Sequence, residues 1–176
     1  MKIIRKIENP GFSRWVHIDL GLTRDHAGIM MGHVPKFVKR NRGQDVVETL
    51  PFVAIDFALN IAPPKNGEIE FSKIRELIYH LVAQGVNLRW VSLDSYQSSD
   101  TIQQLKRKDI ASGIFSVDKD PKAYFLLREA LLDRRIIIPY HERLIDELRF
   151  LEWDELKGKV DHLQKDPRIF RIVWRR

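Results

Sequence analysis

The sequence predicts a single mixed α/β domain, with helices packed on both faces of a sheet that holds antiparallel and parallel strands. Three strand-like runs come first, rich in Val, Ile and Phe and punctuated by Gly and Pro, at residues 14–20, 27–34 and 46–61. Their close spacing favours antiparallel pairing. Helical and strand-like patterns then alternate, as in crossover connections between parallel strands.

The elements after residue 61 follow from their hydrophobic spacing. The first helix is predicted from Ser72, a candidate cap, to Gly85, a stop signal, with Ile74, Leu77, Ile78, Leu81 and Val82 at helical spacing. We then expect a strand over residues 86–94, a polar helix over 98–109 and a short strand at 112–117. Two last helices, at 123–132 and 140–153, flank the apolar pair Ile137 and Ile138.

Composition narrows the class of protein. With 176 residues and 44% hydrophobic content, the chain can bury a core of its own. It has no cysteine, so it has no disulfide, thiolate metal site or cysteine nucleophile, and we expect the reducing cytoplasm of a cell. No apolar run approaches the roughly 18 residues of a membrane span, so no membrane partner is expected.

The positive charge is concentrated in two places. Residues 163–176 carry five basic and one acidic side chain, so this tail accounts for most of the net charge of +6. We therefore divide the chain into a domain at 1–162 and an atypical basic tail at 163–176. Within the domain, a polar loop gathers candidate contacts to a DNA backbone, or simply solvated side chains: Lys36, Lys39, Arg40 and Arg42.

Two carboxylates end apolar strand runs. If the second half of the chain crosses over right-handed, the strand ending at Asp94 lies parallel to the strand ending at Asp19, and both emerge at the carboxyl edge of the sheet. Two close carboxylates repel unless they share a proton or hold a cation. Oxygen ligands without cysteine favour Mg²⁺ or Mn²⁺. The alternative is that both aspartates only cap turns.

Several motifs, taken in order, resemble the nuclease domain of phage terminase large subunits. The matching stretches are "HIDLGLTRDHAGIMMGH", "VSLDSYQSSDTIQQLKRK" and "GKVDH", and the resemblance covers residues 12–162. It implies a ribonuclease-H-like fold and a metal-dependent DNA endonuclease that cuts double-stranded DNA with two divalent ions during genome packaging. It also implies partners in the packaging complex, namely a terminase ATPase domain, a small subunit and a portal.

Site residues are carried over by position. Asp19 and Asp94 match the first two catalytic metal ligands of the family. Asp25 also matches the pattern, and it either supports a ligand or belongs to the hairpin turn. Gln97 and Ser98 fit the strand-to-helix connection that positions Asp94.

The chain departs from the family in two respects. It lacks a phosphate-binding Gly-rich motif, so translocation is not expected of it. In the family, the third acidic ligand follows "GKVDH" in a motif like "GSKD" at the start of a final helix, whereas this chain reads "LQKDPRIFRIVWRR". Asp161, His162 and Asp166 are the candidate replacements.

A frameshift can account for the atypical tail. With permitted codons chosen for residues 165–176, the reading two nucleotides later gives Gly-Ser-Lys-Asp-Ile-Ser-Asp-Ser-Leu-Ala-Glu, which restores the family motif. The nucleotides of the gene itself test this hypothesis.

Three functions remain open. The first is the terminase-type endonuclease, impaired if the third ligand is lost. The second is a catalytically inactive prophage remnant, or a packaging module that binds DNA or a partner. The third is another ribonuclease-H-like enzyme, such as a junction resolvase. The tryptophans at 15, 90 and 153 are expected in the core, with base stacking as the alternative.

Overall fold

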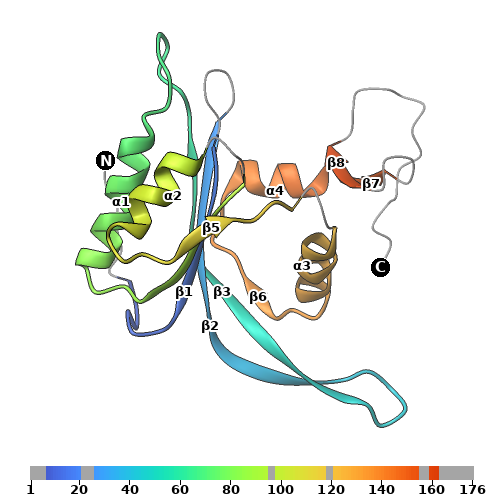
Figure 1. The fold of residues 1–176 in the computed structure, drawn as a ribbon. Helices are drawn as coiled ribbons and strands as arrows, with labels where there is room; N and C mark the ends of the chain where they lie inside the picture. Colours follow the sequence, from blue (N-terminus) through green and yellow to red (C-terminus); the bar gives the residue numbers. More distant parts are fainter. Residues whose placement is uncertain (1–6, 21–25, 95–97, 118–120, 155–158, 163–176) are drawn as a thin grey trace.

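The computed structural model describes residues 7–20, 26–94, 98–117, 121–154 and 159–162. A six-stranded sheet forms the centre of the molecule, in the order β5-β4-β1-β2-β3-β6. In Figure 1, α1 (Phe71–Ala83) and α2 (Ser99–Lys106) lie on one side of this sheet, and α3 (Lys122–Leu132) and α4 (Glu142–Arg149) lie on the other. The predicted mixed α/β class is confirmed.

The strands of the sheet are as follows: β1 Arg14–Asp19, β2 Ala27–Asn41, β3 Val47–Ile61, β4 Leu88–Leu93, β5 Ser112–Ile114 and β6 Ile136–Ile137. β1, β2 and β3 are antiparallel neighbours, whereas β4 pairs parallel to β1, and β5 parallel to β4. The right-handed crossover rule therefore predicted the correct neighbour for β1.

The hairpin formed by β2 and β3 is longer than the sequence suggested. β2 continues to Asn41, and its outer half projects beyond the body of the molecule in Figure 1. Lys36, Lys39 and Arg40 therefore lie in a strand, and the expectation of a polar loop was wrong for them. In this outer half of β2, polar and apolar residues alternate, as is typical of a strand that packs against few other elements.

The first face of the sheet is closed by α1 (Phe71–Ala83) and α2 (Ser99–Lys106). Apolar side chains from both helices meet those of the central strands in one cluster: Val16, Ile18, Ala27, Ile29, Met31, Ile69, Ile74, Ile78, Leu81, Val86, Val91, Leu93, Ile102, Leu105 and Ile110. Gly85, at φ +79°, ends α1 as predicted, because that conformation costs glycine little. Ser72 lies inside the helix, so its predicted capping role was wrong.

The second face carries α3 (Lys122–Leu132) and α4 (Glu142–Arg149), and it is much more open. Ala130 is the single buried residue of α3, and α4 has none. The helix predicted over residues 140–153 was too long, because β7 (Leu151–Asp154) pairs with β8 (Lys159–His162) as a separate two-stranded sheet. No helix among the described residues has the length and apolar character needed to cross a membrane.

Candidate active site

Asp19 and Asp94 lie side by side at the carboxyl edge of the sheet. β1 and β4 are parallel and in register at Ile18 and Leu93, the residues immediately before the two aspartates. The backbone N–H of Asp94 donates to the carbonyl of Ile18 at 3.2 Å, which extends the ladder to this pair. The predicted juxtaposition of the two strand ends is therefore present in the structure.

Strand alternation places both aspartates on the second, open face of the sheet. Val16, Ile18, Val91 and Leu93 point to the first face and are at most 1% exposed. The residues between them point the other way, so Asp19 shares a face with His17, and Asp94 with Ser92. Asp19 is exposed, and Asp94 is partly buried.

One oxygen of Asp94 lacks a partner. Its Oδ1 is buried and accepts no hydrogen bond within the described part of the chain. A buried carboxylate oxygen is costly unless it is paired or coordinates a cation. This atom and the neighbouring Asp19 therefore fit two ligands of a divalent cation better than they fit two turn caps.

His17 joins the two strands beside the aspartates. Ser92 Oγ donates to the carbonyl of Val16 at 3.2 Å, so its only proton is used, and it accepts from Nδ1–H of His17 at 2.9 Å. Burial lowers the pKa of His17 below its usual value, against the attraction of the Asp94 and Asp19 carboxylates, which raise it. In this arrangement Nδ1 carries a proton, so the neutral ring has its lone pair on Nε2.

The third ligand is where the site departs from the family pattern. No group of three His, Cys, Asp or Glu side chains that could hold a metal ion occurs in the described ranges. Asp161 lies in β8, where its backbone pairs with Glu152, and His162 pairs with Leu151. Asp25, Gln97 and Asp166 lie outside the described residues, as does the whole tail 163–176.

The polar connection after β4 has one described member. Ser98 precedes α2 and is buried, and its hydroxyl makes no hydrogen bond to any described residue, so it does not cap the helix with its side chain.

The four predicted DNA contacts have different surroundings. Arg40 Nη2 donates to the carbonyl of Asp133 at 2.7 Å, and Arg42 forms ion pairs with Glu48 and Asp133 at 2.8 and 3.0 Å. Both arginines therefore tie the hairpin to the end of α3, and Arg42 also links its two strands. Lys36 Nζ lies 5.0 Å from the centre of the Phe52 ring, and Lys36 and Lys39 are exposed. A role in DNA binding stays a prediction.

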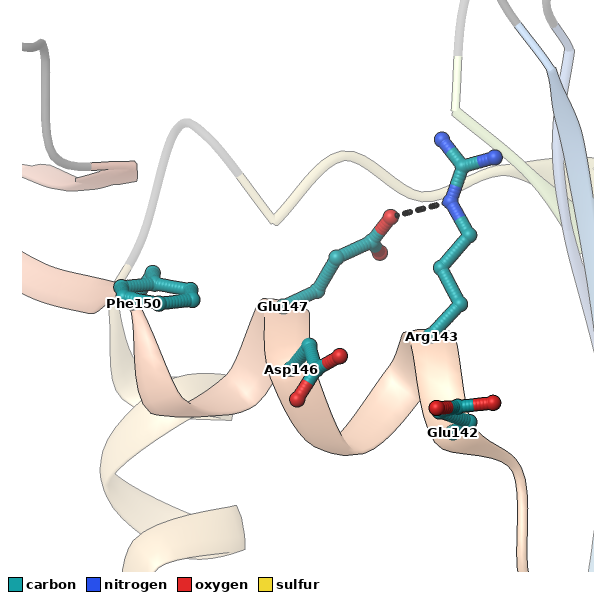
Figure 2. A pocket seen from close by; sticks show the side chains of 5 residues that line it. All are labelled: Glu142, Arg143, Asp146, Glu147 and Phe150. Carbon is teal, nitrogen blue, oxygen red and sulfur yellow. Dashed lines mark hydrogen bonds and ion pairs between the residues drawn. The ribbon is translucent and has the colours of Figure 1, made fainter.

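A second group of carboxylates lies on α4. Figure 2 shows a shallow hollow lined by Glu142, Arg143, Asp146, Glu147 and Phe150, in which Arg143 Nε donates to Glu147 at 2.8 Å. Arg143 Nη1 also lies 3.1 Å from Nδ1 of His26. These carboxylates project from an exposed helix, and neither Asp19 nor Asp94 lines the hollow. We therefore do not assign the candidate active site to this hollow.

Two signals in the sequence point to this arrangement and were missed. The stretches "RWVHID" at 14–19 and "RWVSLD" at 89–94 share four of six residues, and the structure pairs Trp15 with Trp90, Val16 with Val91 and His17 with Ser92. The alternation within each stretch also places His17 and Ser92 beside the aspartates.

Comparisons with known proteins support the fold. No family model and no curated protein sequence matches the chain. Among solved structures, the chain is similar to the large terminase nuclease from thermophilic phage G20c, with a TM-score of 0.58 and 14% identity over 90% of this chain and 76% of that one. It is similar to the HK97 bacteriophage large terminase with the same score and identity, over 89% of this chain and 36% of that one.

The chain thus has the ribonuclease-H-like fold of terminase nuclease domains, as the sequence predicted. It spans about a third of the length of the HK97 large terminase. At 14% identity these likenesses establish the fold, and the activity has to be argued from the site.

Proposed function

We propose that the chain is a metal-dependent DNA endonuclease domain of the phage terminase type, which cuts double-stranded DNA in genome packaging. The observation that carries this proposal is the pair of aspartates at adjacent strand ends, one with a buried oxygen that has no partner. The carboxyl edge of an open α/β sheet is where ligands usually bind.

Asp19 and Asp94 would hold one or two Mg²⁺ or Mn²⁺ ions. When bound, such ions activate a water for attack on a phosphodiester and stabilise the leaving oxygen. His17 would hold β1 and β4 in register through Ser92, which keeps the two carboxylates at a fixed spacing.

The proposed setting is the cytoplasm of a bacterial host, in a complex with a separate ATPase domain, a small subunit and a portal. The structural likeness to large terminases supports this setting. Lys36 and Lys39 on the projecting hairpin are the proposed contacts to the DNA backbone, because Arg40 and Arg42 already have partners within the chain.

A plasmid-nicking assay in Mn²⁺ or Mg²⁺ tests the proposal. The wild type should nick, whereas Asp19→Ala and Asp94→Ala should not. Asp100→Ala is the matched control, because Asp100 is an exposed carboxylate near the start of α2 and pairs with Arg75 at 3.1 Å. Equal nicking by all four proteins would reject the site.

The second candidate is a non-catalytic module that keeps the fold and binds DNA or a protein. The absence of a third acidic ligand among the described residues favours it. Calorimetry with Mn²⁺ separates the two functions, because the endonuclease requires at least one ion whose binding is lost in Asp94→Ala. Comparison of branched with linear DNA substrates separates both from a junction resolvase.

A further inference from the structure

The second face of the sheet exposes an aromatic pair in line with the aspartates. Trp15 and Trp90 are partners across β1 and β4, and they are 45% and 40% exposed. The expectation that these two rings lie in the core was therefore wrong. Phe115, 53% exposed, continues the surface and contacts His17 edge to face, with 6.3 Å between ring centres.

Close packing against Gly113 of β5 fixes the orientation of the Trp90 ring. A Cβ atom added to Gly113 on the neighbouring strand would lie 2.7 Å from Cζ2 of Trp90, so glycine at this position lets the indole lie flat against the backbone. A flat, half-exposed indole presents one free aromatic face to the outside.

Basic residues lie at the amino end of the same strands, around the edge that β5 forms. Arg89 precedes Trp90 on β4. Lys106, Arg107 and Lys108 end α2 on the first-face side of this edge and lead into β5, whose Ser112 pairs with Val91. All four are exposed, and none forms an ion pair within the part of the chain that the structure describes. Asp109 is the one acidic residue beside them.

We infer that this surface binds the unpaired bases of a single nucleic-acid strand. Bases stack on exposed aromatic rings whatever their sequence, and basic side chains beside such rings hold the phosphates. Lys106 and Lys108 favour a nucleic acid over a protein partner, because lysine is depleted at protein–protein interfaces.

The geometry agrees with a strand that continues to the carboxylates. Trp15 and Asp19 are four residues apart on β1, or about 13 Å along an extended strand. A strand whose bases stack on Trp15 and Trp90 therefore reaches the carboxylates within a few nucleotides. The inference rests on the proposed function and deepens it: the DNA strand that reaches Asp19 and Asp94 is locally unpaired next to the cut.

Fluorescence anisotropy with two labelled probes tests base stacking. The first is an oligothymidine of about twelve nucleotides, and the second is an abasic oligomer of equal length and charge. Measurements in chelator, on the Asp19→Asn/Asp94→Asn protein, prevent cleavage and keep the result independent of nuclease activity. The oligothymidine should bind about tenfold or more tightly than the abasic probe.

Variants of the aromatic pair locate the effect. Trp15→Leu/Trp90→Leu should remove the preference for bases, Trp15→Phe/Trp90→Phe should keep most of it, and Gly113→Ala should weaken it by displacing the Trp90 ring. Trp153→Leu is the matched control, because Trp153 contacts Phe125 of α3, with 5.6 Å between ring centres. Urea denaturation confirms that each variant is folded.

The charged cluster has its own test. Lys106→Gln/Arg107→Gln/Lys108→Gln should weaken both probes equally and reduce the salt dependence of binding. Arg149→Gln, on exposed α4, is its control.

Equal affinity for the two probes, or an unchanged preference in Trp15→Leu/Trp90→Leu, would overturn the inference. Protection of both rings from iodide quenching in the free protein, together with no binding of either probe, would also overturn it, because a protein segment would then cover the face. The plasmid assay is separate, so loss of nicking with intact base preference would reject the nuclease and leave the binding surface in place.

Discussion

The two faces of the sheet differ although they are built from alternate residues of the same strands. On the first face, Ile18 and Leu93 are fully buried beneath α1 and α2. On the second face, Asp19 next to Ile18 is exposed, and so are Trp15 and Trp90, three residues before Ile18 and Leu93 on their strands. The first face thus supplies the stability of the fold, and the second is free to carry chemistry.

The two helical layers are also attached differently. α1 and α2 contribute five buried residues in the core cluster, Ile74, Ile78, Leu81, Ile102 and Leu105. The layer of α3 and α4 is joined to the hairpin mostly through charged groups, with Asp133 at the end of α3 bound by Arg40, Arg42 and Arg135. Four apolar side chains of α3 stay exposed: Phe125, Leu126, Leu131 and Leu132. The second layer should therefore depend more on salt and pH than the first.

The largest expected effect separates activity from stability at Asp94. Asp94→Asn should lower nicking by about a thousandfold or more, beyond the ten- to hundredfold typical of residues that only orient a metal ligand. Its free energy of unfolding should be unchanged or slightly higher, because one of two neighbouring carboxylates loses its charge. Parallel nicking and urea-denaturation curves measure both.

A large loss of stability in Asp94→Asn would instead show that the second face holds the fold together, and the contrast between the faces would then fail. Asp100→Asn serves as the control for removing an exposed carboxylate.

The opposite result is expected at Ile18, the residue before Asp19 on β1. Ile18→Ala should lower the free energy of unfolding by about 2–5 kcal/mol, because a fully buried side chain leaves a cavity beneath α1 and α2. Trp15→Leu, on the other face of the same strand, should cost much less. Urea denaturation of both variants measures the difference, and equal losses would contradict the proposed division of labour.

A buried charge interrupts the apolar first layer at the start of β1. Arg14 is fully buried and bonded to both oxygens of Asp56 at 3.2 and 3.3 Å, as well as to the carbonyls of Glu8, Asn9 and Phe12. Asp56 Oδ2 also accepts from Nδ1–H of His33 at 3.1 Å. The aspartate is thus the only carboxylate that balances this guanidinium among the described residues.

Asp56→Ala should therefore destabilise the protein by about 3 kcal/mol, near the lower end for removal of one partner from a buried pair, since three carbonyls still solvate the guanidinium. Urea denaturation measures the loss. Glu76→Ala, which breaks an exposed pair with Lys73 at 3.5 Å, should have almost no effect. A cost for Asp56→Ala as small as that of the control would mean that the carbonyls alone satisfy Arg14.

The sequence predicted more of the fold than of the site's surroundings. The placement of β4 beside β1 followed from the crossover at residues 71–85, since the handedness of such connections is nearly invariant. The juxtaposition of Asp19 and Asp94 followed from the same rule, whereas their function as ligands stays a prediction. The exposure of Trp15 and Trp90 could not be read from the sequence, because an aromatic residue in a strand looks the same whether its face is covered or open.

The positions of the arginines in the hairpin show a similar limit. Arg40 and Arg42 looked like free charges in a loop, but their partner Asp133 lies about ninety residues away along the chain. Only the tertiary structure brings the two together. The end of α4 was mispredicted because Leu151 and Trp153 continue a helical pattern that also suits the strand β7.

The smallest expected effect concerns pH and the attachment of the second layer. The guanidinium groups of Arg135 and Arg42 lower the pKa of Asp133 below its usual value. A carboxylate with a lowered pKa in the folded state stabilises the fold above its unfolded pKa, and that stabilisation is lost as pH falls through the folded pKa. The ordinary pKa of an aspartate, which applies in the unfolded chain, is about 4. As pH falls from about 4 through the lower pKa of folded Asp133, the wild type should therefore lose a small increment of stability.

Asp133→Asn should lack this increment, so the difference between its urea midpoint and that of the wild type should shrink as pH falls through this window. High salt should shrink the same difference at pH 7, because the ion pairs lie near the surface. Leu105→Ala, on the first face, should show a difference that neither salt nor acid changes in this way. If both variants respond alike, the two layers are not held by different forces, and the contrast drawn between them does not hold.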